Sequence, residues 1–445
     1  MKHDPQALRH SSICRQLALL ARGEICSQQL TEAYLDAAEA ENAHSRAYVS
    51  IDRAGALRAA KASDERRDGG RALGRLDGIP LAIKDSLDVQ GLVTSAGLAG
   101  RSKRVALRDA AVITRLRGAG AVILGKTSLD EGSLGAMGRT AHQGDVPNPR
   151  HPGKVAGGSS AGSAAAVALG LASAAIGSDT MGSVRIPAAF CGVFGLRPTM
   201  GEVSSAGLWP CLPRLDSAGP LTRSMDDLTL LLQTLSGYDP NDPRTRQRRV
   251  PLATPDWEPG RLRSGVAQDL GRLGASAAVQ KAFDQALAAA APALGQTQPV
   301  LLADFELGRA RRAALLMMEA GMALSDPEDL DDCSQRLRDM LDFARQKSAV
   351  DYARAERRLD EAVVATRRLF DSIDVLLLPT TPDLPPAIDS EEPANLADFT
   401  AFASLAGCPA LSIPLDGGAG LQLVGPRGSD LRLLELGEIV YSLIG

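Results

Sequence analysis

The sequence predicts an α/β fold, in which buried strands alternate with amphipathic helices. Ile79, Leu81 and Ile83 alternate with smaller or polar residues as in a strand, and the apolar runs at 121–125 and 374–379 have the length of buried strands. Segments whose apolar residues recur at helical spacing separate these runs. The apolar fraction of 44% and charged fraction of 23% are typical of a globular protein. Strands interleaved with helices indicate an α/β architecture.

The elements expected in the first third of the chain alternate in this way. Ile13, Leu17 and Leu20 have helical spacing, and a glycine turn precedes the strand that contains Ile79. In order, we expect helices at 5–22, 27–41 and 53–66, the strand around 79–83, a helix at 108–117, a strand at 121–125, a short helix at 127–137 and a proline-rich loop at 145–154.

Residues 156–198 form the most unusual stretch of the chain. A Gly/Ser turn leads into a helix of small residues, and a second Gly/Ser turn precedes an apolar segment. A helix rich in Ala and Gly has little apolar area to bury, but it allows other backbone and a ligand to come very close. We therefore predict that the active site lies in this stretch.

The remainder of the chain is loop-rich and then helical. Residues 239–262 are dense in proline and charge, which fits either a domain linker or a surface excursion of one domain. The elements expected after residue 198 are helices at 224–235, 276–293, 305–323 and 327–370, a strand at 374–379, short apolar runs at 410–415 and 421–425, and a final helix at 430–443.

Charge and cysteine usage exclude several function classes. A net charge of −4 gives no reason to expect a nucleic acid or an anionic membrane as partner. The first ten residues lack the apolar core of a signal peptide and no run of 18 apolar residues occurs, so we expect a cytoplasmic protein. The six cysteines form no CxxC pair, which favours buried free thiols over disulfides or a metal site.

Three catalytic patterns fit poorly. Residues 120–127 match the letters of a phosphate-binding loop, but their middle positions are Ala, Val, Ile and Leu, which predict a strand. Ser160 is the centre of a GxSxG match, yet no strand precedes it and no histidine follows His151, so an α/β-hydrolase triad is excluded. None of the five histidines lies in a motif that would serve another Ser-His-Asp order.

A serine nucleophile without a histidine needs another base, and Lys84 is the best candidate. Burial lowers the pKa of a lysine and leaves a free amine, and Ser-Lys variants of the triad are established chemistry. No Ser-x-x-Lys occurs, which excludes the β-lactamase arrangement. From spacing alone, the alternative that Lys84 reaches water from the end of its strand stays open.

Five blocks of sequence together resemble the amidase signature family. They are GIPLAIKD (78–85), AGGSSAGSAAAVALGL (156–171), GSDTMGSVRIPAAFCGVFGLRPT (177–199), DVLLLPTTP (374–382) and GLQLVGPRGSDLRLL (420–434). The resemblance implies a single domain over residues 1–445, built on a mixed sheet of about eleven strands covered by helices on both sides. Within it we expect an N-terminal helical segment at 1–70, a signature core at 71–200 and a surface excursion at 240–262.

The resemblance also implies catalytic roles. Ser183 would be the acylated nucleophile, Ser159 the bridging serine and Lys84 the base, with a cis peptide bond between Gly158 and Ser159. The implied relay passes the proton of the Ser183 hydroxyl through Ser159 to the neutral amine of Lys84.

Further residues take supporting roles in this scheme. Ser178 would support the relay, and Asp179 and Arg185 would lock the active-site turn through an ion pair. Met181 stands where the family usually has glycine; we expect it to have an ordinary φ and to reshape the edge of the pocket, while Ser133 would contact substrate. The oxyanion would be held by the backbone N–H groups of Thr180, Met181, Gly182 and Ser183.

The expected function is hydrolysis of C–N acyl bonds without cofactor or metal. Linear amides and carbamates (urethanes) are the leading substrates, with esters as a further class. The alternatives are a glutamine-hydrolysing amidotransferase subunit that delivers ammonia to a partner, and a hydrolase of ureides such as biuret or allophanate. For the leading hypothesis we expect a small-molecule substrate and a monomer or homodimer. A catalytically inactive binding protein has little support, because Lys84, Ser159 and Ser183 are all present.

Overall fold

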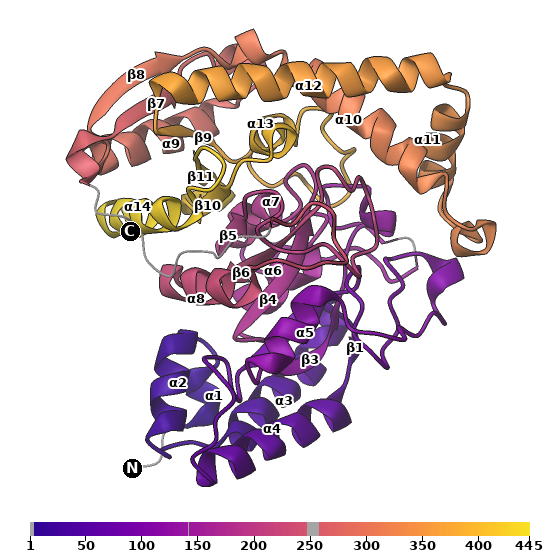
Figure 1. Ribbon diagram of the computed structural model, residues 1–445, viewed down its shortest axis with the longest axis vertical. Coiled ribbons are helices and arrows are strands. Elements are labelled where there is room, and N and C mark those ends of the chain that lie inside the picture. The colour runs from indigo at the N-terminus through magenta and orange to yellow at the C-terminus, as the bar shows by residue number, and fades with distance from the viewer. Residues whose placement is uncertain (1–3, 141, 247–257) are drawn as a thin grey trace.

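A computed structural model describes residues 4–140, 142–246 and 258–445 (Figure 1). Its strands form one mixed sheet, in the order β1-β3-β2-β4-β6-β5-β10-β11-β9-β7-β8. The strands are β1 Tyr48–Ile51, β2 Pro80–Lys84, β3 Val122–Thr127, β4 Ala174–Asp179, β5 Phe194–Arg197, β6 Ser217–Thr222, β7 Arg263–Ala267, β8 Gln296–Val300, β9 Val375–Pro379, β10 Ala410–Pro414 and β11 Gly420–Val424. The expected fold class, with about eleven strands in a mixed sheet, is confirmed.

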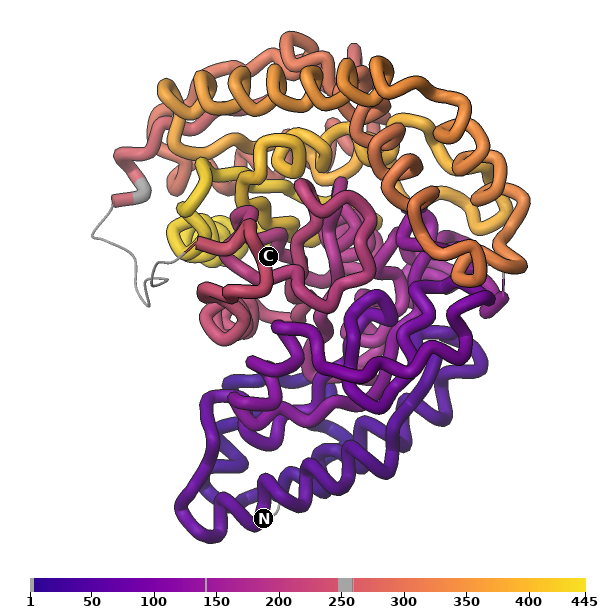
Figure 2. Tube along the Cα trace, turned by 45° about the vertical axis from the view of Figure 1, so that its right-hand side comes forward, coloured from indigo at the N-terminus to yellow at the C-terminus, as the bar shows by residue number. Residues whose placement is uncertain are grey.

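Fourteen α-helices are present in the described part of the chain. They are α1 Pro5–Leu8, α2 Ile13–Ala21, α3 Ser27–Ser45, α4 Arg53–Asp68, α5 Ala111–Gly118, α6 Ala161–Ala168, α7 Arg185–Cys191, α8 Met225–Leu235, α9 Ala277–Ala290, α10 Leu307–Met322, α11 Gln335–Arg345, α12 Ala349–Ser372, α13 Asp398–Ala406 and α14 Asp430–Ile444. Figure 2 shows the N-terminal helices at one end of the molecule and α10–α12 at the other. None of the described helices is long and apolar enough to cross a membrane.

Helices cover both sides of the sheet, and β10 shows how. Successive side chains of a strand point to opposite faces. Leu411 and Ile413 point toward α14, where a Cβ added at Gly437 would lie 2.3 Å from Leu411. On the other face, Gln422 of the neighbouring β11 binds the side chain of Arg185, which belongs to α7. The turns that carry Ser159 and Ser183 lead into α6 and α7, respectively.

The parallel pairing of β2 with β4 determines where the predicted active site lies. β2 pairs in parallel with β4, with Ile83 opposite Ile176, so their carboxyl ends lie at the same edge of the sheet. Lys84 is the last residue of β2, and Ser178 and Asp179 are the last two of β4. Open α/β sheets bind their ligands at such carboxyl ends.

Two of the expected helices are divided into separate helices in the structure. The helix expected at 5–22 is two helices, because Ser12 caps α2 by accepting the Arg15 N–H at 3.2 Å. Serine side chains at helix starts satisfy backbone donors that have no partner within the helix. The same happens in the segment 327–370, where Ser334 and Ser348 cap α11 and α12 as separate helices.

The prediction of a short helix at 127–137 is wrong. Only a three-residue 3-10 turn, Glu131–Ser133, is present there. Gly132 and Ser133 both have a φ of 62°, a left-handed conformation that stops an α-helix.

The expected outline also lacks several elements that the structure contains. In residues 156–198 it has one helix between two turns, whereas the structure adds β4 and α7. Outside that stretch the elements without a sequence signal are β1, β6, β7, β8 and α13. The edge strand β8 reads QTQPV and β6 reads SAGPLT, so neither shows the apolar alternation of a half-buried strand.

The strands on both sides of residues 240–262 belong to the same sheet. β6 lies before this segment and β7 after it, and both are members of the eleven-stranded sheet. Residues 247–257 lie outside the described part of the chain, so the surface excursion expected there stays a prediction, as do the other expected domain boundaries.

Candidate active site

Lys84 is fully buried at the end of β2. Every residue of that strand is buried, and the lysine amine donates hydrogen bonds to the hydroxyls of Ser159 at 2.7 Å and Ser178 at 2.8 Å. Burial lowers the pKa of Lys84 to about 8, although nearby acidic groups, Asp130 first among them, partly offset this effect. The alternative of a lysine that extends to water is therefore excluded, and a neutral amine is accessible at mildly alkaline pH.

Ser159 lies in the turn that precedes α6. The peptide bond between Gly158 and Ser159 is cis. The Ser159 side chain is buried, and its carbonyl accepts the backbone N–H of Asp130 at 3.3 Å. The neighbouring hydroxyl of Ser160, the centre of the GxSxG match, instead contacts the backbone of Ser178, donating to its carbonyl at 3.2 Å. Ser160 thus connects this turn to β4.

Ser183 is the accessible hydroxyl of the group. It is partly exposed, while Lys84, Ser159 and Ser178 are buried. Its carbonyl accepts the Ser160 N–H at 3.0 Å, which brings the two Gly/Ser turns together. In the described part of the chain its hydroxyl has no hydrogen-bond partner, so the expected step from Ser183 to Ser159 stays a prediction.

The turn 180–183 presents backbone amides beside this hydroxyl. The N–H of Gly182 donates to Asp179 Oδ1 at 2.9 Å, so this amide is engaged, contrary to the expectation that all four amides face the oxyanion. Among the described residues, no acceptor binds the N–H groups of Thr180, Met181 or Ser183. These three amides therefore have no partner in the described part of the chain, and their role toward the oxyanion stays a prediction.

The backbone of the turn explains its glycine. Gly182 has a φ of 128°, and a Cβ there would lie 2.2 Å from Thr400 Oγ1. Met181, in contrast, is not among the described non-glycine residues with positive φ, as expected for it. Its carbonyl accepts the hydroxyl of Thr400 at 2.6 Å, which fixes the orientation of this peptide.

A buried ion cluster locks the turn from beneath. Asp179 binds Arg185 through two hydrogen bonds of 2.9 and 2.8 Å and Arg197 through one of 3.1 Å, and all three side chains are inaccessible. Burial alone would raise the pKa of Asp179, but Arg185 and Arg197 hold it well below its usual range. The ion pair expected between Asp179 and Arg185 is present, extended by Arg197.

Replacing Arg185 with alanine is expected to destabilise the protein strongly. It leaves the Asp179 carboxylate buried without its main partner, a loss of about 3–5 kcal/mol in the free energy of unfolding. Urea denaturation of Arg185→Ala against Arg345→Ala provides the measurement, since the Arg345–Asp342 pair is more than half exposed and contributes less than about 1 kcal/mol. Equal stability of the two variants would contradict a locking role for Arg185.

Ser133 and Met181 are the two residues that we expect to contact substrate. Ser133 is buried and has a φ of 62°, and its hydroxyl has no hydrogen-bond partner among the described residues. Met181 belongs to an apolar cluster that includes Leu98, Leu134 and methionines of α10. A free hydroxyl beside an apolar wall is suited to a substrate that is mostly apolar with one polar group. Substrate contact by either residue stays a prediction.

Other residues of the site were not expected from the sequence. Asp216 accepts the Thr180 hydroxyl at 2.6 Å and the Cys211 N–H at 3.0 Å, and burial raises its pKa. Asp130 lies against the Ser159 turn. These carboxylates come from distant segments without a motif of their own, so no local signal identifies them.

The phosphate-loop match has a structural explanation. Its residues 122–127 form β3, and the amine of Lys126 is held by Asp85 at 2.8 Å, by the Val93 carbonyl at 3.0 Å and by the Thr94 hydroxyl at 3.0 Å. A lysine engaged in this way has no role in phosphate binding, which supports the rejection of that motif.

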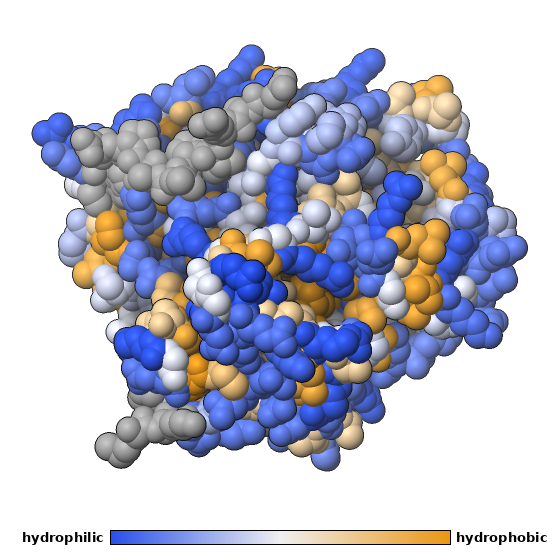
Figure 3. Space-filling view, turned by 60° about the horizontal axis from the view of Figure 1, so that its bottom comes forward, coloured by the Kyte–Doolittle hydropathy of each residue, from blue (hydrophilic) through white to orange (hydrophobic). Residues whose placement is uncertain are grey.

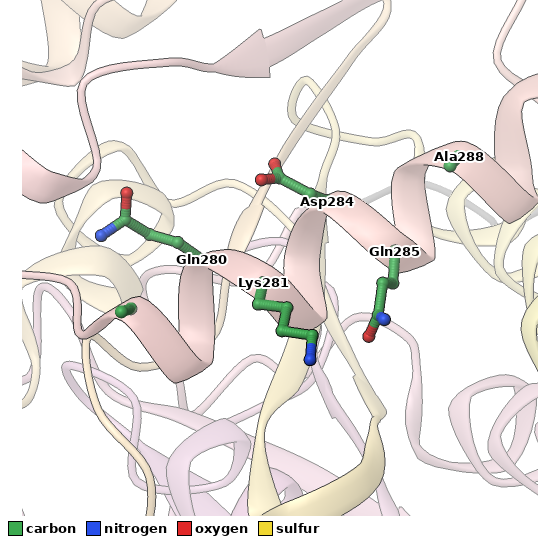
Figure 4. A pocket seen from close by; sticks show the side chains of 6 residues that line it. Gln280, Lys281, Asp284, Gln285 and Ala288 are labelled. Atoms are coloured by element: carbon green, nitrogen blue, oxygen red, sulfur yellow. The ribbon is translucent and has the colours of Figure 1, made fainter.

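Hollows elsewhere on the molecule contain none of the three predicted catalytic residues. One of 500 Å³ is lined only by residues of α9; in Figure 4 the side chain of Asp284 points upward from this helix and that of Lys281 points downward. Another, of 980 Å³, lies between α9 and α14 and includes Arg150 and His151. In the described residues no group of three His, Cys, Asp or Glu side chains could hold a metal ion. All six cysteines are free, and four of them are buried.

Comparison with known families agrees with this arrangement. The family model described as Amidase matches residues 29–434. The chain belongs to the amidase signature family. Members of this family are hydrolases that act on C–N bonds, and the relatives named below cover between 86% and 98% of this chain.

Two named relatives and one solved structure are especially similar to this amidase. A glutamyl-tRNA(Gln) amidotransferase subunit of Thioalkalivibrio sulfidiphilus is 33% identical, with 98% of each chain covered. AtzE of Pseudomonas sp. strain ADP, which is one subunit of 1-carboxybiuret hydrolase, is 34% identical over 86% of this chain and 87% of that protein. The solved structure, described as a vestigial protein complex that reveals the origins of an s-triazine catabolic enzyme, superposes with a TM-score of 0.89 at 31% identity, covering 97% of this chain and 98% of that one.

Proposed function

We propose that this amidase hydrolyses linear amides or carbamates through an acyl-enzyme on Ser183, with Ser159 as bridge and Lys84 as base. The observation that carries the proposal is the buried amine of Lys84, hydrogen-bonded to Ser159 at 2.7 Å and adjacent to the turn that presents Ser183. A lysine with a lowered pKa can accept a proton, and the accessible serine can attack a carbonyl.

The proposed reaction proceeds in two halves. The Ser183 oxygen attacks the carbonyl carbon while its proton passes to Ser159 and the proton of Ser159 passes to Lys84. The oxyanion accepts hydrogen bonds from the free amides of the turn, and the leaving amine takes the proton back through Ser159 as the C–N bond breaks. Water then attacks the acyl-enzyme, with the same relay accepting its proton, and releases the acid and the free serine.

The free hydroxyl of Ser133 and the side chain of Met181 support a substrate with one polar group beside an apolar part.

A ureide hydrolase is the second candidate. It is favoured by the relative that belongs to 1-carboxybiuret hydrolase and by a non-glycine residue at position 181. Both candidates share the Ser183–Ser159–Lys84 chemistry and differ only in the group next to the carbonyl.

A glutamine-hydrolysing amidotransferase subunit is the third candidate, favoured by the names of several relatives. Such a subunit requires a stable partner chain. The face in Figure 3 shows hydrophobic side chains in separate groups among hydrophilic ones. Surfaces that bind a partner permanently are usually more continuous in their apolar area, and this face therefore gives no support to a permanent partner.

A substrate panel separates these candidates. We expect kcat/KM for aryl amides and carbamates to exceed that for glutamine by at least about a hundredfold, because about 3 kcal/mol of transition-state binding distinguishes a fitting acyl group from a poor one. Ureides, esters and peptide amides complete the panel, and light scattering of the purified chain gives its oligomeric state. Activity on glutamine alone, and only after a partner protein is added, would contradict the proposal.

A further inference from the structure

Asp130 lies directly against the turn that carries Ser159. Its side chain is buried, and its carboxylate accepts the N–H groups of Gly138 at 2.9 Å and Arg139 at 3.1 Å. A Cβ added at Gly158 would lie 1.8 Å from Asp130 Oδ2, so the carboxylate fills the place of a side chain at that glycine. No other described side chain comes as close to the Cβ position of Gly158.

We propose that Asp130 is a positioning residue of this amidase, which holds Ser159 toward Lys84 and stabilises the charged form of that lysine. The inference rests on the proposed function, because it assigns Asp130 a role in the same relay.

The positioning role follows from the contacts of both its backbone and its side chain. The backbone N–H of Asp130 donates to the Ser159 carbonyl at 3.3 Å, and the side chain packs on Gly158, so one residue contacts both Gly158 and Ser159. Asp130 is itself anchored, because its carbonyl accepts the Ser133 N–H at 2.8 Å. A shift of Asp130 would therefore move the Ser159 hydroxyl relative to the Lys84 amine, and misplacement by about 1 Å costs up to a hundredfold in rate.

The electrostatic role follows from the groups that face Lys84. Desolvation is the largest effect on Lys84 and lowers its pKa. The ionisable groups around it raise its pKa; in decreasing order of effect they are Asp130, Cys211, Asp179 and Asp216. Asp179 is neutralised by two arginines, and Asp216 is bound by the Thr180 hydroxyl. Asp130 has no salt bridge among the described residues, and its field therefore acts on Lys84 with the least compensation.

Asp130 is in turn influenced by its own surroundings. Burial raises its pKa, whereas the N–H groups of Arg139 and Gly138, and then the charges of Arg336 and Lys84, lower it. Glu392, which pairs with Arg336 at 2.9 Å, faces the same group, and the charge of Asp130 contributes to raising the pKa of Glu392 after burial. Loss of the Asp130 charge is expected to lower the pKa of Lys84, because a protonated amine loses its main favourable partner.

The test compares Asp130→Asn with the wild-type chain on an amide substrate. We expect kcat at the alkaline plateau to fall about tenfold with KM changed less than about twofold. We expect the acid limb of kcat/KM to move to lower pH by about half a unit or more, since the amine then loses its proton more easily. A purely structural role would lower the melting temperature without moving the acid limb.

Glu131→Gln is the matched control. Glu131 is the next residue and also buried, but its carboxylate accepts the Ser334 N–H at 2.8 Å on the side of α11 and is not among the main groups that shift the pKa of Lys84. The acid limb of kcat/KM in Glu131→Gln should coincide with that of the wild type. Asp130→Ser, which removes the charge and leaves space, is expected to show the same shift if the asparagine variant does not fold.

An acid limb that stays in place, or moves to higher pH, in Asp130→Asn or Asp130→Ser would overturn the inference, and so would failure of both variants to fold. Failure of the proposed function is distinguishable from these results. In that case the wild type itself would show no acid limb near pH 8, or Ser183→Ala would retain activity, whatever Asp130 does.

Discussion

Ser183→Ala is expected to reduce kcat/KM on amides by at least about a thousandfold, because it removes the atom that attacks the carbonyl. The melting temperature should change little, since the Ser183 hydroxyl has no hydrogen-bond partner among the described residues. Initial rates on the best amide of the panel provide the measurement. Ser173→Ala is the control: that serine lies in the same stretch of the chain, but it is buried and its hydroxyl donates to Gln16 at 2.7 Å, away from the site.

Covalent labelling locates the nucleophile independently of any substrate. A fluorophosphonate reacts with an activated serine, and trypsin would release the label on residues 155–185. That peptide contains six serines, so fragmentation is needed to distinguish Ser183 from Ser159 or Ser160. We expect the label on Ser183 and its loss in Ser183→Ala. A label on Ser160 in the folded wild type would refute the assignment.

The parts of the fold that could be predicted are those with a strong local pattern. β2, β3 and β9 are short apolar runs and were expected close to their observed bounds, and α8 follows a serine cap with acidic residues in its first turn. β7 and β8 could not be predicted in this way. They pair at the edge of the sheet, where exposed and polar side chains replace the apolar alternation.

The residues of the candidate site also differ in whether the sequence could predict them. Lys84, Ser159 and Ser183 lie in blocks of sequence that resemble a known family, so their roles could be proposed in advance. The buried carboxylates of Asp130 and Asp216 could not, since their place in the site depends on contacts with residues far along the chain, Gly158 for Asp130 and the Thr180 hydroxyl for Asp216. The engagement of the Gly182 amide by Asp179 also depends on the three-dimensional path of the turn, which spacing does not reveal.

Lys84→Met is expected to abolish most amidase activity and to change how stability depends on pH. The acid limb of wild-type kcat/KM should have an apparent pKa near 8, because the proposed base must be neutral to accept a proton. In the unfolded chain the same amine has a pKa of about 10.4, so between these values the unfolded state binds a proton that the folded state does not. Wild-type stability should therefore rise with pH across this window.

The difference in unfolding free energy between wild type and Lys84→Met isolates this effect from other titrating groups. It should shift in favour of the wild type by about 3 kcal/mol as the pH rises from about 8 to 10.4, as a pKa lowered by roughly 2.5 units requires.

Lys126→Met is the control for the loss of a buried lysine that lies outside the proposed relay. It removes a buried lysine paired with Asp85 at 2.8 Å and should destabilise the protein at neutral pH, with no specific effect on amide over ester hydrolysis. Lys84→Met should instead retain relatively more activity on esters, whose leaving group needs less protonation. Equal losses of amide and ester hydrolysis in Lys84→Met would mean that Lys84 is not the base. A difference in unfolding free energy between wild type and Lys84→Met that stays the same at about pH 8 and about pH 10.4 would mean that the pKa of Lys84 is not lowered.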